Sequence, residues 1–344
     1  MRVLVTGADG YIGVVLSRYL QQHGHEVVGL DTGFYRQGWL YPIGGRQPPV
    51  LTKDLREVSP EDVAGFDAIA HLAELSNDPL SQQDPGLTHA INHGGSVRLA
   101  EAAKAAGVRR FVYMSSCSVY GANPADAEFV DETTPSQPLT AYAECKVKVE
   151  QDVGAMAGAA FAPCFLRNAT AYGASPRQRF DIVLNDLCGL AWTTKKITLN
   201  SDGSAWRPLV HILDIAQAIE LSLRADEDRI RGQIFNVGSS EQNYRVIDIA
   251  REVAAVFPDC ELETGAKSVD NRSYRVDFSK IKQLLPEFSC RWDARKGAEQ
   301  MLEMFRRTEM SREVFQSEPY TRLKMLLKLR RTGLLDDRLF WTYA

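Results

Sequence analysis

The chain has 344 residues, 44% of them hydrophobic, and a formal net charge of −4. This is enough for one large core or two joined domains, and the mixed signs of charge give no basic face that would predict nucleic-acid binding. No apolar run approaches the ~18 residues of a membrane span, and a predicted core strand begins at residue 2, so we expect a cytoplasmic protein without a signal peptide. The six cysteines show neither CxxC pairing nor metal-ligand spacing, so we expect reduced thiols and no metal.

The chain opens with the pattern strand, glycine-rich turn, helix. Residues 2–6 are apolar and β-branched, and residues 12–22 have a helical apolar pattern. Between them lie three glycines at a spacing of three: Gly7, Gly10 and Gly13. In a dinucleotide-binding fingerprint these glycines permit a tight turn, close approach of a pyrophosphate and close helix–strand packing. We expect the amides of Tyr11 and Ile12 to face the phosphates at the positive end of the helix dipole.

The next predicted strand, 25–31, ends in an acidic residue. Asp31 follows the glycines by about 20 residues, where a carboxylate bonds the adenosine ribose. A carboxylate repels a 2′-phosphate, so the sequence predicts NAD rather than NADP. A glycine-rich turn alone is often only a turn, but here both context and spacing favour the cofactor.

Strands and helices alternate through the rest of the chain. Further strands are predicted at 49–52, 67–71, 110–115, 162–167 and 233–238, and further helices at 60–64, 87–106, 140–158, 213–223 and 245–256. This order predicts an α/β fold with a Rossmann-type, doubly wound parallel sheet and ligands at the carboxyl ends of its strands. Residues 173–209 predict mainly turns. The tail, 315–335, predicts an amphipathic basic helix with Leu323, Leu326, Leu327 and Leu334 on one side, which either docks on the protein or binds a membrane or partner.

A candidate acid–base set lies about 130 residues after the glycines. Tyr142 and Lys146 are four apart on a predicted helix, so they share a face. A tyrosine is a poor base at its usual pKa of about 10, but a neighbouring ammonium and a cationic nicotinamide favour the phenolate. Ser116, at the end of the preceding predicted strand, can bond the same substrate oxygen. Such a set removes a proton from an alcohol as hydride leaves its carbon. The alternative is a core tyrosine and a solvated lysine.

The ordered motifs resemble the extended short-chain dehydrogenase/reductases, in particular the nucleotide-sugar epimerases and dehydratases. The resemblance covers about residues 1–290. Its motifs are TGxxGYIG at 6–13, Asp31, Asp54-Leu55, HLA at 71–73, Asn92, SSxSVYG at 115–121, Tyr142/Lys146, LRxxxxYG at 166–173, WRPLVHILDIA at 206–216 and FNVGS at 235–239.

The resemblance implies NAD as the cofactor and assigns further cofactor contacts. Asp54 and Leu55 flank the adenine, Leu72 and Ala73 line the cofactor channel, and Asn92 supports the geometry of the site. Ser115, Tyr142 and Lys146 are also expected to contact the cofactor. Lys146 can hold the nicotinamide ribose.

The resemblance also implies a nucleotide-diphosphate sugar as substrate. Arg207 is expected on its pyrophosphate, where a guanidinium fork suits the ligand, and Asn185 near its nucleotide. Either Lys267 or Arg272 supplies another phosphate contact. Ser76, Ser116, Thr170 and Arg177 complete the expected substrate set, although the basic segment 175–181 that holds Arg177 either embraces a diphosphate or turns the chain.

The implied organisation is an NAD-binding domain at 1–167, to which 207–236 returns, and a smaller mixed α/β substrate domain at 168–206 and 237–310. A helical tail occupies 311–344. The family also implies a homodimer built on the helices around 90–105 and 140–155.

Departures from the family pattern limit the reaction. Family 4,6-dehydratases carry Asp-Glu after the catalytic Ser or Thr, where this chain has Cys117-Ser118, which argues against that reaction. Asn168 and Thr170 replace an aromatic and an Asn. Glu74 replaces the Ala that often follows HLA, and either contacts a sugar hydroxyl or is a solvated loop residue.

The sequence therefore predicts an NAD-dependent nucleotide-sugar epimerase that acts at C4 through a 4-keto intermediate. The alternatives are an NAD(P)H-dependent 4-ketoreductase, or another oxidoreductase or dehydratase of a nucleotide-activated deoxysugar. A third alternative is a non-catalytic NAD-binding protein. The presence of all three residues of the acid–base set argues against it.

Overall fold

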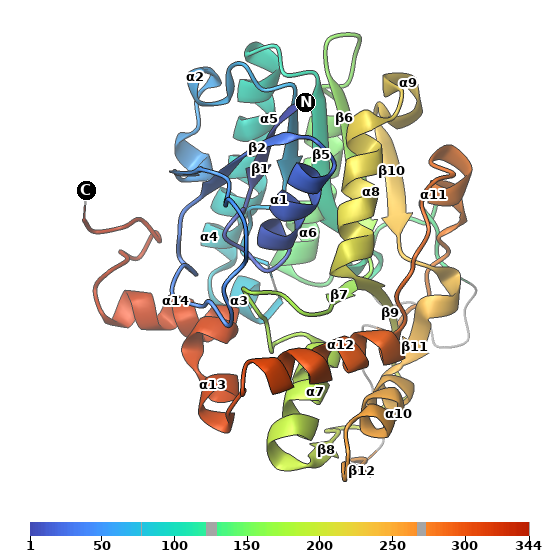
Figure 1. Ribbon diagram of the computed structural model, residues 1–344. Helices are drawn as coiled ribbons and strands as arrows, with labels where there is room; N and C mark the ends of the chain where they lie inside the picture. The colour runs from blue at the N-terminus through green and yellow to red at the C-terminus, as the bar shows by residue number, and fades with distance from the viewer. Residues whose placement is uncertain (77, 122–128, 267–272, 344) are drawn as a thin grey trace.

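The computed structural model describes residues 1–76, 78–121, 129–266 and 273–343. Its centre is a seven-stranded sheet in the order β10-β6-β5-β4-β1-β2-β3, in which every pair of neighbours is parallel (Figure 1). The strands are β1 Arg2–Thr6, β2 Glu26–Asp31, β3 Val50–Thr52, β4 Ala68–His71, β5 Arg110–Ser116, β6 Ala162–Asn168 and β10 Gln233–Val237. This confirms the predicted Rossmann-type fold.

Helices cover both faces of the sheet because its strands are apolar on both sides. Leu4 and Val5 are adjacent on β1, so their side chains enter opposite layers of the core. The layer of Val5 contains α1 Gly13–Gln22, α8 Ile212–Arg224 and α11 Ser279–Leu284. The layer of Leu4 contains α2 Pro60–Val63, α5 Ser96–Ala105 and α6 Ala141–Gly154. The short helix α9, Glu227–Ile230, precedes β10.

The predicted helix 87–106 is three consecutive helical pieces. They are α4 Pro85–Thr88, a π-helical segment His89–Gly95 and α5. The preceding helix, α3, spans Asp78–Gln83. A π-helical turn places side chains differently from an α-helix, and such turns are frequent at functional sites.

The second lobe is built around a smaller sheet with the order β11-β9-β7. Its elements are β7 Thr170–Tyr172, β9 Trp206–His211, β11 Asn243–Arg245, the parallel pair β8 Lys196–Thr198 and β12 Glu261–Glu263, and the helices α7 Val183–Thr194, α10 Val246–Val256 and α12 Ala294–Arg307. These helices bury Leu184, Val253 and Phe305 in one apolar cluster. The expectation of mainly turns over 173–209 was wrong, because α7 lies there.

The C-terminal tail is not the single helix predicted at 315–335. It contains α13 Arg312–Gln316 and α14 Arg322–Arg331, separated by a short 3₁₀ turn that includes Pro319. Proline disfavours helical conformation in the residue before it, which explains the break. Leu326 is buried but Leu327 is exposed, so the predicted apolar side was partly wrong.

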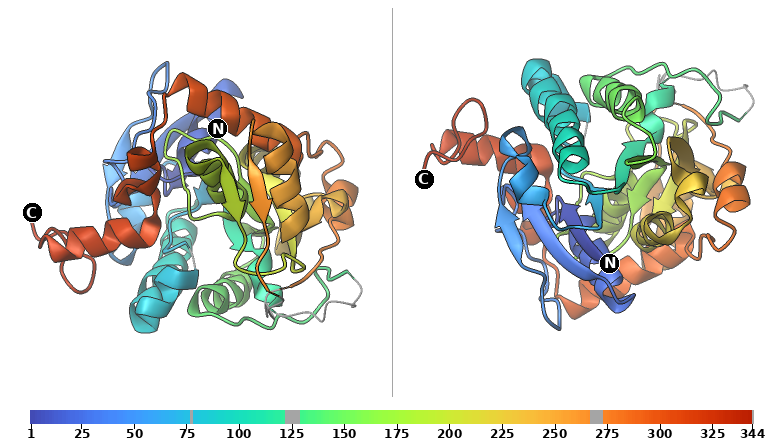
Figure 2. Two further views of the ribbon diagram at one scale, coloured as in Figure 1. Left: turned by 90° about the horizontal axis from the view of Figure 1, so that it is seen from below. Right: turned by 90° about the horizontal axis from the view of Figure 1, so that it is seen from above.

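Helix α14 docks on the segments that follow β2 and β4. It shares an apolar cluster with Phe34, Leu75 and Ile91, and Figure 2 shows it beside the segment after β2 in both views. Within the described ranges, no helix combines the length and apolar character that a membrane crossing requires.

Candidate functional site

A cavity of about 610 Å³ lies at the carboxyl ends of the strands of the large sheet. This is where ligands gather in doubly wound sheets. Most of the predicted site residues line it: Gly7, Gly10, Tyr11, Ile12, Gly13, Asp31, Asp54, Leu55, Leu72, Ala73, Ser76, Ser115, Ser116, Tyr142, Lys146, Thr170 and Arg207. The fold thus brings the glycine-rich turn and the acid–base set into one cavity.

The glycine-rich turn is packed so closely that its glycines leave little or no room for a Cβ atom. Gly7 has φ +71, and a Cβ at Gly13 would lie 2.0 Å from the Gly7 carbonyl oxygen. Helix α1 starts at Gly13, so its positive end lies at this turn, and Gly10 and Gly13 line the cavity. This bare, amide-rich surface fits a dinucleotide pyrophosphate.

Two backbone amides fix the carboxylate of Asp31 at the end of β2. Its carboxylate accepts hydrogen bonds from the Gly33 amide at 2.7 Å and the Asp9 amide at 3.1 Å. Burial raises the pKa of Asp31 to about 6. At neutral pH the carboxylate is therefore ionised and lines the cavity, which fits the ribose of NAD.

Asp54 is fixed differently. Its carboxylate pairs with the Arg56 guanidinium at 2.7 and 2.8 Å and also accepts from the Arg56 amide. The short helical turn Leu55–Glu57 follows from this capping, which places Leu55 at the cavity.

Tyr142, Lys146 and Ser116 come together from α6 and β5. Thr140 caps α6 by accepting from the Ala143 amide at 3.2 Å. Lys146 is buried on the inner side of α6, with its Nζ 5.3 Å from the centre of the Tyr142 ring. The Ser116 hydroxyl accepts from the Ser118 amide at 3.1 Å. The alternative of a solvated lysine is wrong.

The neighbouring Ser115 turns its hydroxyl away from this set. Its Oγ donates to Glu150 Oε1 at 2.5 Å, and Glu150 pairs with the buried Arg167. Alternation along β5 separates the two serines, so the hydroxyl near the acid–base set is that of Ser116.

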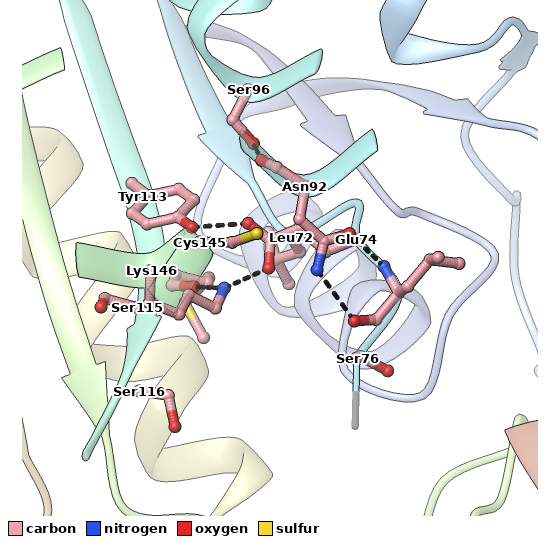
Figure 3. Close-up of polar contacts among 12 residues, drawn as sticks. Leu72, Glu74, Ser76, Asn92, Ser96, Tyr113, Ser115, Ser116, Cys145 and Lys146 are labelled. Carbon is pink, nitrogen blue, oxygen red and sulfur yellow. Dashed lines mark hydrogen bonds and ion pairs between the residues drawn. The ribbon is translucent and has the colours of Figure 1, made fainter. Parts of the chain in front are cut away.

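The unexpected member of the site is Glu74. Its Oε2 lies 2.6 Å from Lys146 Nζ, and its Oε1 accepts from the Tyr113 hydroxyl at 2.5 Å (Figure 3). Lys146 also donates to the Met114 carbonyl. The Glu74 side chain is only 2% exposed, so it is not a solvated loop residue, and its carboxylate is engaged by protein groups.

This pair keeps Lys146 charged. Burial alone would lower the pKa of Lys146, but the carboxylate of Glu74 and the nearby Tyr142 raise it above its ordinary value. In the sequence, Glu74 stood out only because it replaces the Ala that often follows HLA. Its pairing could be found only in the tertiary structure, since its partner Lys146 lies 72 residues further along the chain.

Two buried polar groups hold the segment that carries Glu74. The Asn92 amide accepts from the Leu75 amide at 2.8 Å and donates to the Leu75 carbonyl at 3.0 Å (Figure 3). His71, at the end of β4, lies 2.6 Å from Thr6 Oγ1 and 2.8 Å from Ser96 Oγ. Burial lowers the pKa of His71 to about 3, so it is neutral. Asn92 thus positions the wall of the cavity without lining it.

Two predicted substrate residues lie behind the cavity wall. Arg177 is buried, donates to the Tyr35 and Arg36 carbonyls, and stacks over Trp39. Asn185 bonds the Gly173 amide and the Tyr11 hydroxyl. Neither side chain lines the cavity, because each is used to join loops that surround it. Lys267 and Arg272 lie outside the described residues.

Sequence reasoning missed four charged residues of the cavity wall. They are Lys53, Arg179, Asp181 and Arg322. Arg179 belongs to the basic segment 175–181 noted in the sequence, whereas Arg322 begins α14 in the tail. No local motif marks Arg322, since only docking of the tail brings it to the cavity.

Comparisons with known proteins agree with this geometry. The family model described as the NAD dependent epimerase/dehydratase family matches residues 3–238. The UDP-glucose 4-epimerase of Mycolicibacterium smegmatis is 33% identical over 300 residues, covering 83% of this chain and 92% of that protein. The UDP-glucose 4-epimerase of Corynebacterium glutamicum is 29% identical over 276 residues, covering 74% and 80%.

Two solved structures with the same architecture are each more than 25% identical to this chain. TunA, an NAD-dependent NDP-hexosamine 5,6-dehydratase of tunicamycin biosynthesis, has a TM-score of 0.78 and 26% identity, covering 89% of this chain and 98% of that one. MoeE5 in complex with UDP-glucose and NAD has a TM-score of 0.75 and 28% identity, covering 90% and 100%.

Proposed function

Because the chain belongs to the NAD-dependent epimerase/dehydratase family, we propose that it epimerises a nucleotide-diphosphate sugar at C4 with tightly held NAD. The observation that carries the proposal is that Ser116, Tyr142 and Lys146 share one cavity with the glycine cradle and Asp31. A set that moves a proton at an alcohol is thereby joined to a site for a hydride carrier.

The protein's own groups handle the proton. Tyr142 takes the proton of the substrate hydroxyl, and the Lys146 ammonium favours the phenolate form that can accept it. Ser116 donates a hydrogen bond to the same oxygen as it becomes a carbonyl. Bound NAD, held by the glycine-rich turn and Asp31, would supply acceptance and return of the hydride. With the proton given back by Tyr142, return to the opposite face of the keto carbon would invert C4 without net redox change.

Substrate binding is proposed for the residues of the second lobe that reach the cavity. Arg207, on β9, lines the cavity and offers a planar guanidinium to a diphosphate. Thr170, on β7, and Ser76, after β4, also line the cavity and are proposed to contact the sugar. Lys267 and Arg272 remain predictions from the family resemblance.

The second candidate is an oxidoreductase or dehydratase of a nucleotide-activated sugar. Likeness to TunA supports a dehydratase, and Glu74 places a carboxylate next to Tyr113 and Lys146. Against it, Glu74 is already paired. At the dehydratase Asp-Glu position the chain has Cys117, whose thiol pKa is raised by burial, and Ser118. A net reductase acting on 4-keto sugars uses the same three catalytic groups.

The test is turnover of sugar nucleotides in D₂O, followed by proton NMR and mass spectrometry. Epimerisation at C4 returns the same hydrogen to the same carbon, so we expect inverted product of unchanged mass without deuterium. Product that has lost water establishes a dehydratase. Activity only with 4-keto sugar nucleotides and added NADH or NADPH establishes a reductase.

The cofactor content of the purified protein is measured first. Denaturation should release NAD in near-equal molar ratio to the chain, since a cofactor regenerated in each turnover has no need to leave. An empty site, or one that fills preferentially with NADPH, contradicts the epimerase proposal and favours the reductase.

Assembly and location are part of the same proposal. We propose a cytoplasmic homodimer that uses the helices near 90–105 and 140–155, in which α5 and α6 lie. Light scattering at several protein concentrations tests the dimer, and a monomer at all of them rejects it.

A further inference from the structure

Three arginines are buried beside one another at or just behind the cavity wall, two from the segment 175–181 and one from the tail. Arg177, Arg179 and Arg322 are 2%, 8% and 3% exposed. Asp181 pairs with Arg179 through both carboxylate oxygens, at 2.8 and 3.1 Å. Asp181 also accepts from the backbone amide of Arg322, at 3.3 Å, rather than from its guanidinium.

The guanidinium of Arg322 is the unbalanced charge of this group. Its Nη2 is buried and has no hydrogen-bond partner among the residues that the structure describes. Its closest packing is against the ring of Tyr35, at 4.1 Å. Burial, and then the charge of Arg179, lower the pKa of Arg322 to about 10, so it is still a cation at neutral pH. Asp181 and Asp31 offset part of this charge, but neither carboxylate bonds the buried Nη2, and a buried charged donor without a partner points to an anionic ligand.

The cavity already offers space for that ligand. Arg179 and Arg322 line it together with Tyr35 and with the glycine-rich turn. Arg179 also reaches Ser76 Oγ at 3.2 Å, which holds its Nη1 toward the cavity side of the segment after β4. The unbonded Nη2 of Arg322 suits a diphosphate oxygen, and Arg179, which Asp181 and Ser76 hold in place, adds positive charge at the same wall.

Two diphosphates are expected in this protein, and the contacts of the tail favour the cofactor's. Beyond Arg322, the tail touches the segments after β2 and β3. Trp341 donates to the Thr32 carbonyl at 2.7 Å, and Arg56 donates to the Arg338 carbonyl at 2.8 Å. These segments carry Asp31 and Asp54, at the adenosine end of the cavity.

We propose that Arg179 and Arg322 form a second anion subsite for the pyrophosphate of NAD, so that the C-terminal tail completes the cofactor site. The glycine-rich turn supplies backbone amides, and the tail adds a charged side chain. The tail then acts as a strap that slows release of the cofactor. The inference rests on the cofactor of the proposed function and is independent of which sugar carbon reacts.

The experiment measures how fast bound NAD exchanges with isotopically labelled NAD. Arg322→Gln should speed the exchange at least tenfold, with a smaller effect for Arg322→Lys, which keeps a charge but loses the fork. Arg330→Gln is the matched control, since Arg330 lies on the same helix, pairs with exposed Asp337, and is remote from the cavity lining. Its exchange rate should equal that of the unmodified protein.

A second arm separates the two diphosphates. Affinity for UDP, measured by titration calorimetry, should change less than threefold in Arg322→Gln. A loss of UDP affinity with unchanged NAD exchange overturns the assignment to the cofactor, and unchanged values in both arms overturn the subsite altogether.

If Arg322→Gln fails to fold, Arg322→Met keeps the packing on Tyr35 and provides the same comparison. NAD exchange needs no sugar turnover, so rejection of C4 epimerisation leaves this test intact.

Discussion

Lys146 Nζ lies 2.6 Å from Glu74 Oε2, and both side chains are almost completely buried. The lysine that should favour the Tyr142 phenolate is thus already paired with a carboxylate. Part of its positive charge is neutralised before any ligand binds. The balance among these three groups sets the pH range in which Tyr142 can act as a base.

Removing that carboxylate should shift the pH dependence of activity. In Glu74→Gln the Lys146 ammonium loses its carboxylate partner, and Tyr142, whose negative charge also raises the pKa of Lys146, takes that place. The phenolate is then favoured more strongly, so the acidic limb of kcat/KM should move down by about one pH unit. The variant should also lose about 3 kcal/mol of stability, since a buried lysine loses its partner. The measurement is a pH–rate profile with a melting curve. The control is Glu144→Gln, which changes an exposed carboxylate on α6, the helix that carries Lys146. An identical shift in that variant would contradict the effect assigned to Glu74.

Loss of the Tyr142 hydroxyl should remove catalysis while leaving the cofactor bound. Tyr142→Phe should lower kcat by roughly 10² to 10⁴, because a general acid–base group contributes that much. The NAD content should not change. Steady-state kinetics and cofactor release on denaturation check the two statements. A Tyr142→Phe variant with full activity would support a protein in which NAD is only structural or regulatory.

The glycine cradle should tolerate no side chain at Gly13. In Gly13→Ala the new Cβ would meet the Gly7 carbonyl oxygen at 2.0 Å, which forces α1 away from the turn. We expect a loss of ~3 kcal/mol in the free energy of unfolding and of most retained NAD. Gly44→Ala is the control, since nothing lies within 4 Å of a Cβ there. Equal stability of the two variants would reject the close contact.

Asp31 should set the preference for NAD over NADP. Asp31→Asn removes the charge that repels a 2′-phosphate but keeps the size of the side chain. The ratio of NAD to NADP affinity should fall at least tenfold, as measured by titration of cofactor-free protein. Asp9→Asn, a neighbouring carboxylate paired with Arg36 and outside the cavity lining, should leave the ratio unchanged.

His71 should make the protein less stable in acid. Its pKa is about 3 in the folded protein and about 6.5 when unfolded, so between these values the unfolded chain binds the extra proton. Stability is therefore complete above about pH 6.5 and falls as pH decreases, by about 2 kcal/mol at pH 5. Denaturant unfolding from pH 7 to 5 should show a shallower slope in His71→Gln than in His93→Gln, which alters a half-buried histidine paired with Asp152. Equal slopes would exclude His71 as the cause.

Local sequence was sufficient for the large sheet and for most of the site. Buried parallel strands are short apolar runs, and the glycines, Asp31, Ser116, Tyr142 and Lys146 lie at fixed offsets from those runs. Parallel order brings their carboxyl ends to one edge, so the cavity follows from local patterns. Helix α7 escaped prediction because it contains Gly189, Val183, Thr193 and Thr194, which have low helix propensity.

Contacts between distant segments were decided only by the tertiary structure. The glycine-rich turn and the pair Tyr142 and Lys146 follow from local sequence, since each depends on residues a few positions apart on one turn or helix. Three other features depend on tertiary packing. Glu74 pairs with Lys146, Arg177 lies behind the cavity wall, and Arg322 of the tail lies at the cavity. No local period encodes such contacts, because the energy that selects them comes from burying apolar surface and matching charges across the finished fold.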